Sequence, residues 1–262
     1  SGQLSEEAVS ANEAIRGIRR EDYAGRKAYG DLIDELHKQK YYNPYIDSTK
    51  LTKNMVELDP KYAHLKDIYD DIINVQGEKK LGLEPNKKNI LFFGLIRTYK
   101  GLDILLEAFG MLPDDYQLIV AGEPYGSFER YQEIIDRIPG KDRIHLNLKY
   151  IKDSEVSEWF SVADLAVLPY RSATQSGISS VSYHFEVPMI VTDVGGLKET
   201  IGDRGTGLVA DEGTPECICS EIIRYFSTPA IRENCIANIR LEKERLSWKT
   251  FAIKLEEFIE SL

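Results

Sequence analysis

Short hydrophobic runs alternate with longer helix-like segments from Asn89 onward. The runs occupy residues 90–94, 117–122, 144–148, 164–168, 188–192 and 206–210. Apolar runs this short are typical of strands buried on both faces of a parallel sheet. Helix-like segments lie between them, at residues 101–112, 128–138 and 154–162. Strands that alternate with helices predict a doubly wound, mostly parallel, Rossmann-like α/β sheet.

The two ends of the chain read differently from this central part. Residues 215–226 and 248–262 have amphipathic helical patterns, and we expect these helices to cover the sheet and pack back across it. Residues 1 to about 88 lack strand-like runs and repeat apolar residues at helical spacing, which predicts a helical segment. The YYNPY cluster at 41–45 is interpreted as a break between two helices.

Composition and charge narrow the class of protein. The chain has 262 residues, and its 42% hydrophobic content is ordinary for a globular protein. Its net charge of -10 argues against a nucleic-acid-binding surface. No apolar run is long enough to span a membrane and no signal peptide is evident, so a cytoplasmic location is expected. Cys217, Cys219 and Cys235 lack metal-like spacing and are interpreted as reduced structural thiols.

Two cations follow the first predicted strand. Gly94 ends that strand, Arg97 and Lys100 lie in the next loop, and Gly101 begins a helix. Right-handed crossovers gather the loops after the carboxyl ends of the strands along one edge of the sheet, where ligands of such folds bind. A cation pair beside a helix N-terminus suits a diphosphate, although a solvated pair of surface cations fits the same spacing.

A second loop of this kind follows the fourth predicted strand. In the segment SATQSGIS from Ser172, the residues Ser176, Gly177 and Ile178 would aim successive amides at an anion at the start of a helix. The same letters also describe an ordinary serine helix cap. The earlier AGEPYGS segment from Ala121 is better interpreted as a tight turn.

A glycine turn follows the fifth predicted strand. Gly195 and Gly196 would let the chain pass beneath a ligand, and Glu199 would hold a sugar or ribose hydroxyl or simply favour a helix N-terminus. The four histidines show no metal-ligand spacing, no catalytic residue is identified, and neither a metal nor a cofactor is expected. His184, in the helix after Gly177, would either face the cleft or take an ordinary surface or core position.

The order of these motifs resembles the nucleotide-sugar-binding lobe of retaining glycosyltransferases of the two-lobed GT-B fold, in the family called glycosyl transferases group 1. The resemblance rests on G-x5-K-G from Gly94, AD-x-x-x-LP from Ala163, P-x-I-x-T-x-x-GG-x-x-E from Pro188, and a late SW at 247–248. It covers residues 68–262 and leaves 1–67 as a helical N-terminal segment. It implies one GT-B lobe that binds a nucleoside diphosphate sugar.

The resemblance assigns roles and also shows departures. Lys100 matches the family's diphosphate-binding lysine, whereas the usual arginine position holds Leu95, with Arg97 two residues later. The family's paired glutamates would fall on Ala173 and Val181, so the site resembles a variant in which Gln175 and Ser176 contact the donor. Gly195, Gly196 and Glu199 are then expected near the sugar or nucleoside.

Two main hypotheses follow. The first is the donor-binding domain of a retaining glycosyltransferase, inactive alone because the acceptor lobe is missing. The second is a non-catalytic binding or scaffold module, from a truncated or engineered chain, in which the helical N-terminal segment binds a protein partner. A nucleotide-sugar epimerase of related fold is a third and weaker alternative.

Overall fold

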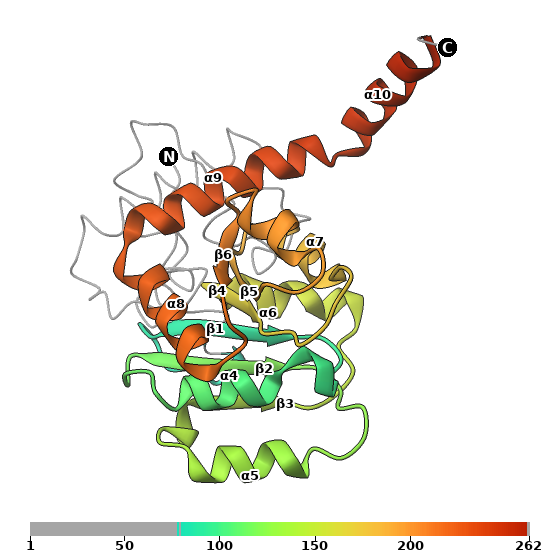
Figure 1. The fold of residues 1–262 in the computed structure, drawn as a ribbon. Coiled ribbons are helices and arrows are strands. Elements are labelled where there is room, and N and C mark those ends of the chain that lie inside the picture. Colours follow the sequence, from blue (N-terminus) through green and yellow to red (C-terminus); the bar gives the residue numbers. More distant parts are fainter. Residues whose placement is uncertain (1–77, 79, 261–262) are drawn as a thin grey trace, which may run out of the picture. The chain divides into compact units, whose positions relative to one another are not determined.

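Residues 78 and 80–260 are described by the computed structural model (Figure 1). The predicted helical segment at 1–67, including YYNPY at 41–45, lies outside the described residues, as do residues 261–262 at the end of the last predicted helix. The predicted division of the chain at 67/68 therefore stays a prediction.

Six parallel strands form one sheet in the order β3-β2-β1-β4-β5-β6. They are β1 (Lys88–Phe93), β2 (Tyr116–Ala121), β3 (Ile144–Asn147), β4 (Leu165–Leu168), β5 (Met189–Thr192) and β6 (Gly207–Ala210). All six predicted strands are confirmed. Ile90 of β1 pairs with Leu118 of β2 on one side and with Leu165 of β4 on the other. The chain thus starts at the centre of the sheet, winds outward to β3, and returns through β4 to the other half.

The helices that follow the strands give the alternation that the sequence predicts. They are α4 (Leu102–Phe109), α5 (Glu129–Arg137), α7 (Gly177–His184), α8 (Pro215–Ser227), α9 (Pro229–Arg245) and α10 (Trp248–Glu260). Shorter turns are η3 (Thr98–Lys100), η4 (Lys141–Arg143) and the π-helix η6 (Lys198–Gly202). The start of α8 shows a local cause, because the Thr214 hydroxyl accepts a hydrogen bond from Cys217 N at 3.3 Å and Pro215 fixes the first turn.

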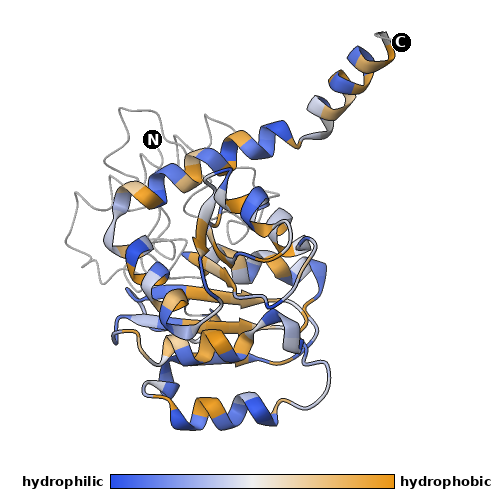
Figure 2. Cartoon of the chain, in the orientation of Figure 1, coloured by the Kyte–Doolittle hydropathy of each residue, from blue (hydrophilic) through white to orange (hydrophobic). Residues whose placement is uncertain are grey.

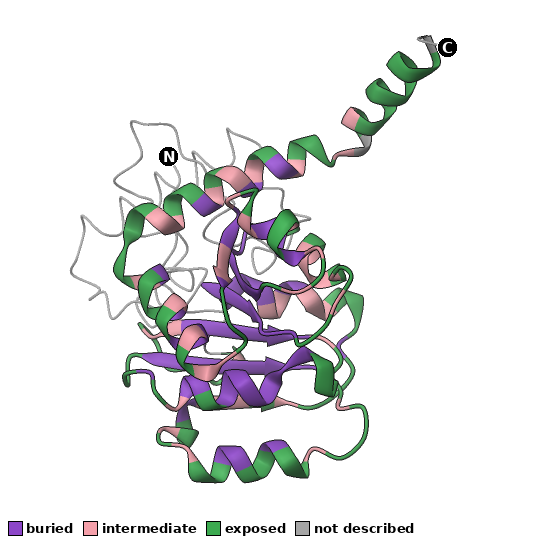
Figure 3. Cartoon of the chain, viewed as in Figure 1, coloured by how far each residue is buried: buried purple, intermediate pink, exposed green. Residues whose placement is uncertain are grey.

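A hydrophobic core lies between one face of the sheet and the helices α4, α5 and α8. Alternate residues of β1, such as Ile90 and Phe92, point into it and meet Phe109 of α4 and Tyr225 of α8. Figure 2 shows apolar strands and mixed helices, and Figure 3 shows the central strands almost wholly buried. Burying a side chain as large as Phe109 contributes about 2 kcal/mol, and this core therefore fixes the strand ends that carry the loops.

Two compact units divide the chain. One combines Ser1–Lys87 with Lys152–Val162, and the other combines Lys88–Ile151 with Ala163–Leu262. The described part of the first unit includes η5 (Asp153–Glu155) and α6 (Val156–Val162), which confirms the predicted helix there. Lys80 forms an ion pair with Glu158 within it. The second unit holds the whole six-stranded sheet.

The prediction that both final helices pack back across the sheet is wrong for α10. Helix α8 packs against α4, β5 and β6, as expected, whereas α10 has a few contacts with α9, which it follows in the chain, and extends away from the end of that helix (Figure 1). Its large apolar side chains are exposed, with Phe251 57% and Phe258 60% accessible (Figure 3). An amphipathic pattern shows that a helix has an apolar face, but it does not say what covers that face.

Two smaller observations bear on the sequence predictions. Cys217, Cys219 and Cys235 are all free, in agreement with reduced thiols. Within residues 78 and 80–260, no helix combines the length and the apolar character needed to cross a membrane. The cytoplasmic location stays a prediction.

Candidate functional site

A cavity of about 400 Å³ opens between the loops that follow β1 and β4. These strands are neighbours in the sheet, but the chain leaves them in opposite directions, β1 toward β2 and β4 toward β5. Such a switch point at the carboxyl ends of parallel strands is where ligands of open α/β folds bind. The lining residues are Tyr99, Lys100, Tyr170, Ser172, Ala173, Thr174, Gln175, Ser176, Gly177 and Ile178.

Lys100 is a buried cation in the wall of this cavity. It ends the η3 turn and is only 8% exposed. Burial, and then the nearby charge of Arg97, lower the pKa of Lys100 to about 8. No carboxylate among the described residues forms an ion pair with it. A buried charge without a counterion is costly, so this position favours an anionic ligand.

The position of Gly94 shows how close Lys100 lies to the start of α7. A Cβ atom added to Gly94 would lie 3.2 Å from Lys100 Nζ and 3.2 Å from Ile178 Cδ1. Any side chain at this position would therefore crowd both neighbours. Gly94 has a φ of 95°, which also disfavours other residues. The glycine keeps the space between the cation and the helix open.

The N-terminus of α7 forms the opposite wall. Ser176 is the cap of this helix, and its Oγ accepts a hydrogen bond from Ile178 N at 3.3 Å. The Tyr170 hydroxyl lies 3.2 Å from the same oxygen and fixes its position. Nothing approaches within 4 Å of a Cβ placed at Gly177, so the first helical residue faces open space. Ser176 is thus a helix cap that satisfies the amide of Ile178, and the N-terminal end of α7, the positive end of its dipole, lies at the cavity.

Arg97 lies outside the lining of the cavity. It is exposed, and its guanidinium stacks on the ring of Tyr125, 4.3 Å from the centroid. Tyr125 N donates a hydrogen bond to Ile96 O at 3.0 Å, which joins the loops after β1 and β2. The two predicted cations therefore occupy different places: Lys100 in the wall and Arg97 at the surface beyond it.

The glycine turn after β5 touches the loop that lines the cavity. Gly195 has a φ of 54°, and a Cβ there would lie 1.6 Å from Ala173 O. Gly196 N donates a hydrogen bond to Thr174 O at 3.0 Å. Neither glycine lines the cavity, and Glu199 is exposed in η6. The turn therefore supports the cavity from behind, and its predicted contact with a sugar or nucleoside stays a prediction.

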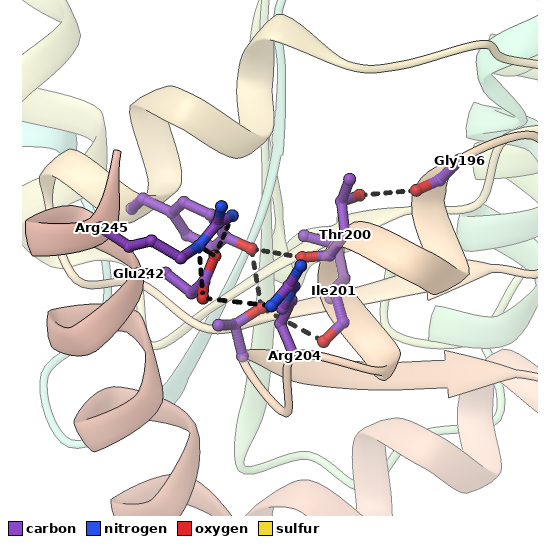
Figure 4. A network of polar contacts seen from close by, with 8 residues as sticks. Gly196, Thr200, Ile201, Arg204, Glu242 and Arg245 are labelled. Atoms are coloured by element: carbon purple, nitrogen blue, oxygen red, sulfur yellow. Dashed lines mark hydrogen bonds and ion pairs between the residues drawn. The ribbon is translucent and has the colours of Figure 1, made fainter. Parts of the chain in front are cut away.

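A polar network continues from this turn into the protein (Figure 4). Thr200 Oγ1 donates to Gly196 O at 2.7 Å, and Thr200 O accepts from the Tyr183 hydroxyl at 2.6 Å. Tyr183 belongs to α7 and also lies 2.8 Å from Thr206 Oγ1. On α9, the ion pair of Glu242 with Arg245 belongs to the same group of polar contacts. The network connects α7, whose first turn faces the cavity, to the turn that supports the cavity loop.

Sequence reasoning brought together Lys100, Gln175, Ser176, Gly177 and Ile178, which all line the cavity. It missed Tyr99 and Tyr170, whose rings meet edge to face with centroids 6.0 Å apart. Burial raises the pKa of Tyr170 to about 12, so its hydroxyl stays protonated. The available signal was their position directly beside Lys100 and directly after β4.

The remaining candidates are the two expected glutamate positions, His184 and the possible metal ligands. Ala173 lines the cavity and Val181 lies on α7, so the two positions where the family resemblance places glutamates hold apolar side chains. His184 ends α7 and is exposed, at the far end of the helix from Gly177, which favours its interpretation as a surface residue. Among residues 78 and 80–260, no cluster of His, Cys, Asp and Glu has the geometry of a metal site.

Comparison with known proteins identifies the fold and the family. The sequence profile of the family described as Glycosyl transferases group 1 matches residues 76–242. A D-inositol 3-phosphate glycosyltransferase from Arthrobacter sp. (strain FB24) is 25% identical over 197 residues, covering 73% of this chain and 47% of the relative. The chain spans about half the length of the curated relatives that it matches.

Solved structures agree. Sucrose-phosphate synthase from Thermosynechococcus elongatus superposes with a TM-score of 0.61 at 21% identity, over 71% of this chain and 48% of that one. Anabaena Alr3699/HepE in complex with UDP superposes with a TM-score of 0.62 at 16% identity, over 71% of this chain and 52% of that one. The C-terminal domain of a glycosyl transferase group 1 family protein from Francisella tularensis superposes with a TM-score of 0.55 at 19% identity, over 66% of this chain and 93% of that one. The sheet is thus one lobe of the GT-B type, and the chain belongs to the glycosyl transferases group 1 family.

Proposed function

We propose that this chain is the donor-binding part of a retaining glycosyltransferase and holds a nucleoside diphosphate sugar in the cavity between β1 and β4. One observation carries the proposal: Lys100 is a buried cation without a carboxylate partner among the described residues, and it lies beside the N-terminal end of α7. A lysine and a helix N-terminus together suit the charge and the oxygen atoms of a diphosphate. The related fold of Alr3699/HepE with UDP and with UDP-glucose supports this ligand class.

The same groups would assist sugar transfer. The bond between the sugar C1 and the diphosphate oxygen breaks, and the diphosphate leaves with the bonding electrons. The acceptor oxygen forms the new bond to C1 on the same face, and its proton passes to the leaving phosphate. Lys100 and the α7 amides stabilise the charge that develops on the leaving group. This scheme uses neither a metal nor a protein nucleophile.

Donor binding and transfer are separate parts of the proposal. Because the chain spans about half the length of its relatives, we assign donor binding to this lobe and transfer to the lobe together with an acceptor-binding partner. Ala173 and Val181 favour the second candidate, a non-catalytic binding module, because the described residues that line the cavity include no carboxylate that would hold a sugar hydroxyl. Gln175 offers a neutral amide in the same part of the cavity.

Thermal unfolding in the presence of uridine, guanosine and adenosine diphosphate sugars tests donor binding. A ligand at about 100 times its Kd stabilises the folded state by about 2.7 kcal/mol. Lys100→Met should reduce the shift, whereas Lys141→Met, at an edge of the sheet before β3, should retain it in full. The absence of a shift with every donor would refute the proposal. Binding with no release of nucleoside diphosphate, even with added acceptor lobe, would favour the non-catalytic module.

A further inference from the structure

The two walls of the cavity come from loops that are distant in the sequence but touch each other. The η3 turn follows β1, and the segment from Pro169 to Ser176 follows β4. A Cβ atom at Gly101 would lie 1.9 Å from Pro169 O, so the two backbones meet without room for a side chain. The relative position of these walls sets the distance between Lys100 and α7.

Arg171 joins the two walls through four hydrogen bonds. Its backbone N donates to Tyr99 O at 2.7 Å, and its Nη1 donates to Thr98 O at 3.2 Å. The guanidinium also forms a bidentate pair with Asp103, from Nη1 to Oδ1 at 2.7 Å and from Nη2 to Oδ2 at 2.9 Å. Thr98 and Tyr99 are the two residues before Lys100. A single side chain after β4 therefore holds both the lysine turn and the first turn of α4.

Asp103 is well placed to keep this contact. Its side chain is 12% exposed, and Arg130 of α5 donates to its Oδ2 at 2.6 Å. Burial opposes ionisation of Asp103, but the hydrogen bonds and charge of Arg171, together with the charge of Arg130, outweigh burial and hold its pKa below the usual value. The carboxylate is thus charged and occupied on both oxygens. Bidentate arginine pairs fix geometry more strictly than a lysine contact would.

We propose that Arg171 and Asp103 are positioning residues of the nucleotide site, whose ion pair holds the η3 turn so that Lys100 stays beside the N-terminus of α7. This inference rests on the proposed diphosphate site. Neither residue lines the cavity, and both act through Lys100. Without the pair, the η3 turn keeps its local hydrogen bonds, such as Lys100 N to Arg97 O at 2.9 Å, and the backbone bond from Arg171 N to Tyr99 O at 2.7 Å. These hold the turn less firmly, and the lysine side chain moves toward solvent.

A double-mutant cycle tests the inference. The affinity of the full chain for UDP is measured by calorimetry for each variant. We expect Arg171→Met to weaken UDP binding about tenfold. Lys100→Met should weaken binding strongly in the native background and less than twofold in the Arg171→Met background, because the lysine is already misplaced there. A purely structural role would leave the effect of Lys100→Met the same in both backgrounds. Equal effects, or native affinity in Arg171→Met, would overturn the inference.

Two further variants separate positioning from general destabilisation. Asp103→Asn keeps the shape of the side chain, removes its charge, and should reproduce the loss seen with Arg171→Met. Arg224→Met removes another arginine pair, the contact with Glu221 at 2.9 Å on α8, and should leave UDP affinity unchanged. If Arg224→Met lowers affinity as much as Arg171→Met, the effect is not one of positioning and the inference fails.

A measurement without ligand keeps the test independent of the proposed function. Amide hydrogen exchange of peptides that cover residues 97–102 should be several-fold faster in Arg171→Met than in the native chain, because the η3 turn has lost its holder. If the native chain binds no uridine, guanosine or adenosine diphosphate sugar, the proposed function fails, while this exchange difference still tests whether the pair of Arg171 and Asp103 holds the η3 turn. Unchanged exchange at 97–102 would refute the positioning role of Arg171 and Asp103 even if UDP binds.

Discussion

Raising the pH from about 7 to about 9 should weaken nucleotide binding by this lobe, because it removes the charge of Lys100. Burial and the charge of Arg97 place the pKa of this lysine at about 8. In the free protein, Lys100 is therefore about nine tenths charged at pH 7 and about one tenth charged at pH 9. A bound diphosphate requires the charged form and raises the pKa again.

The magnitude follows from these fractions. The affinity for UDP should fall about tenfold between the two pH values, which corresponds to about 1.4 kcal/mol. Calorimetric titrations at several pH values in one mixed buffer measure this change. Lys100→Met should bind more weakly at pH 7 and should lack this part of the pH dependence. Ionisation of the nucleotide affects both proteins equally, so the difference between the two curves isolates Lys100.

In the ligand-free protein, the pH dependence of folding stability has the opposite sign to that of binding: stability rises with pH. The folded pKa of Lys100 lies below the ordinary value of 10.5, so the unfolded chain binds the proton more tightly. The charged lysine therefore costs stability below about pH 8, and this cost is relieved as the pH rises from about 8 to 10.5. Lys100→Met should stabilise the free protein at pH 7, by at most about 3 kcal/mol before solvent screening. An affinity that is constant from pH 7 to 9, or a Met variant with the native pH dependence, would refute the reasoning.

Three further changes test the surroundings of the cavity. Gly195→Ala should destabilise the protein by about 3 kcal/mol or more and weaken UDP binding, because the added Cβ would lie 1.6 Å from Ala173 O. The control Gly126→Ala, also at positive φ but in open space, should cost only about 1 kcal/mol. Urea unfolding measures both, and equal costs would contradict the clash. Tyr183→Phe should cost about 1 to 2 kcal/mol, since it leaves Thr200 O without this donor; an unchanged urea midpoint would count against the network. Glu186→Gln should cost about 1 to 2 kcal/mol and lower the melting temperature, because its two part-buried contacts to Arg240 and Lys243 of α9, each at 2.8 Å, lose their charge; a melting temperature within a degree of the native value would argue that these pairs contribute little.

Much of the candidate site follows from where its residues stand relative to the predicted strands. Lys100 and Ser176 each lie in a loop after a strand, and parallel topology brings such loops to one edge of the sheet. The spacing did not separate the role of Lys100 from that of Arg97, because both are cations of the same loop. Only the folded loop shows that one is buried in the cavity wall and the other stacks on Tyr125.

The ion pair of Arg171 and Asp103 could not be predicted in the same way. Asp103 and Arg171 are 68 residues apart, and Arg130 comes from a third segment. Nothing in the local sequence of any of them marks an ion pair, since each resembles an ordinary charged residue of a loop or a first helical turn. Contacts of this kind depend on the order of strands β2, β1 and β4 in the sheet.

The sequence by itself determined the class of fold, the six strands and the loops that carry the chemistry, because these depend on local hydrophobic period and on the position of glycines. The tertiary structure decided which side chains meet. It decided that Lys100 is buried, that Gly195 supports the cavity loop, and that large apolar side chains of α10 are exposed. Burial and charge pairing arise between segments distant in the chain, and the pattern of one segment contains no information about its neighbour across the sheet.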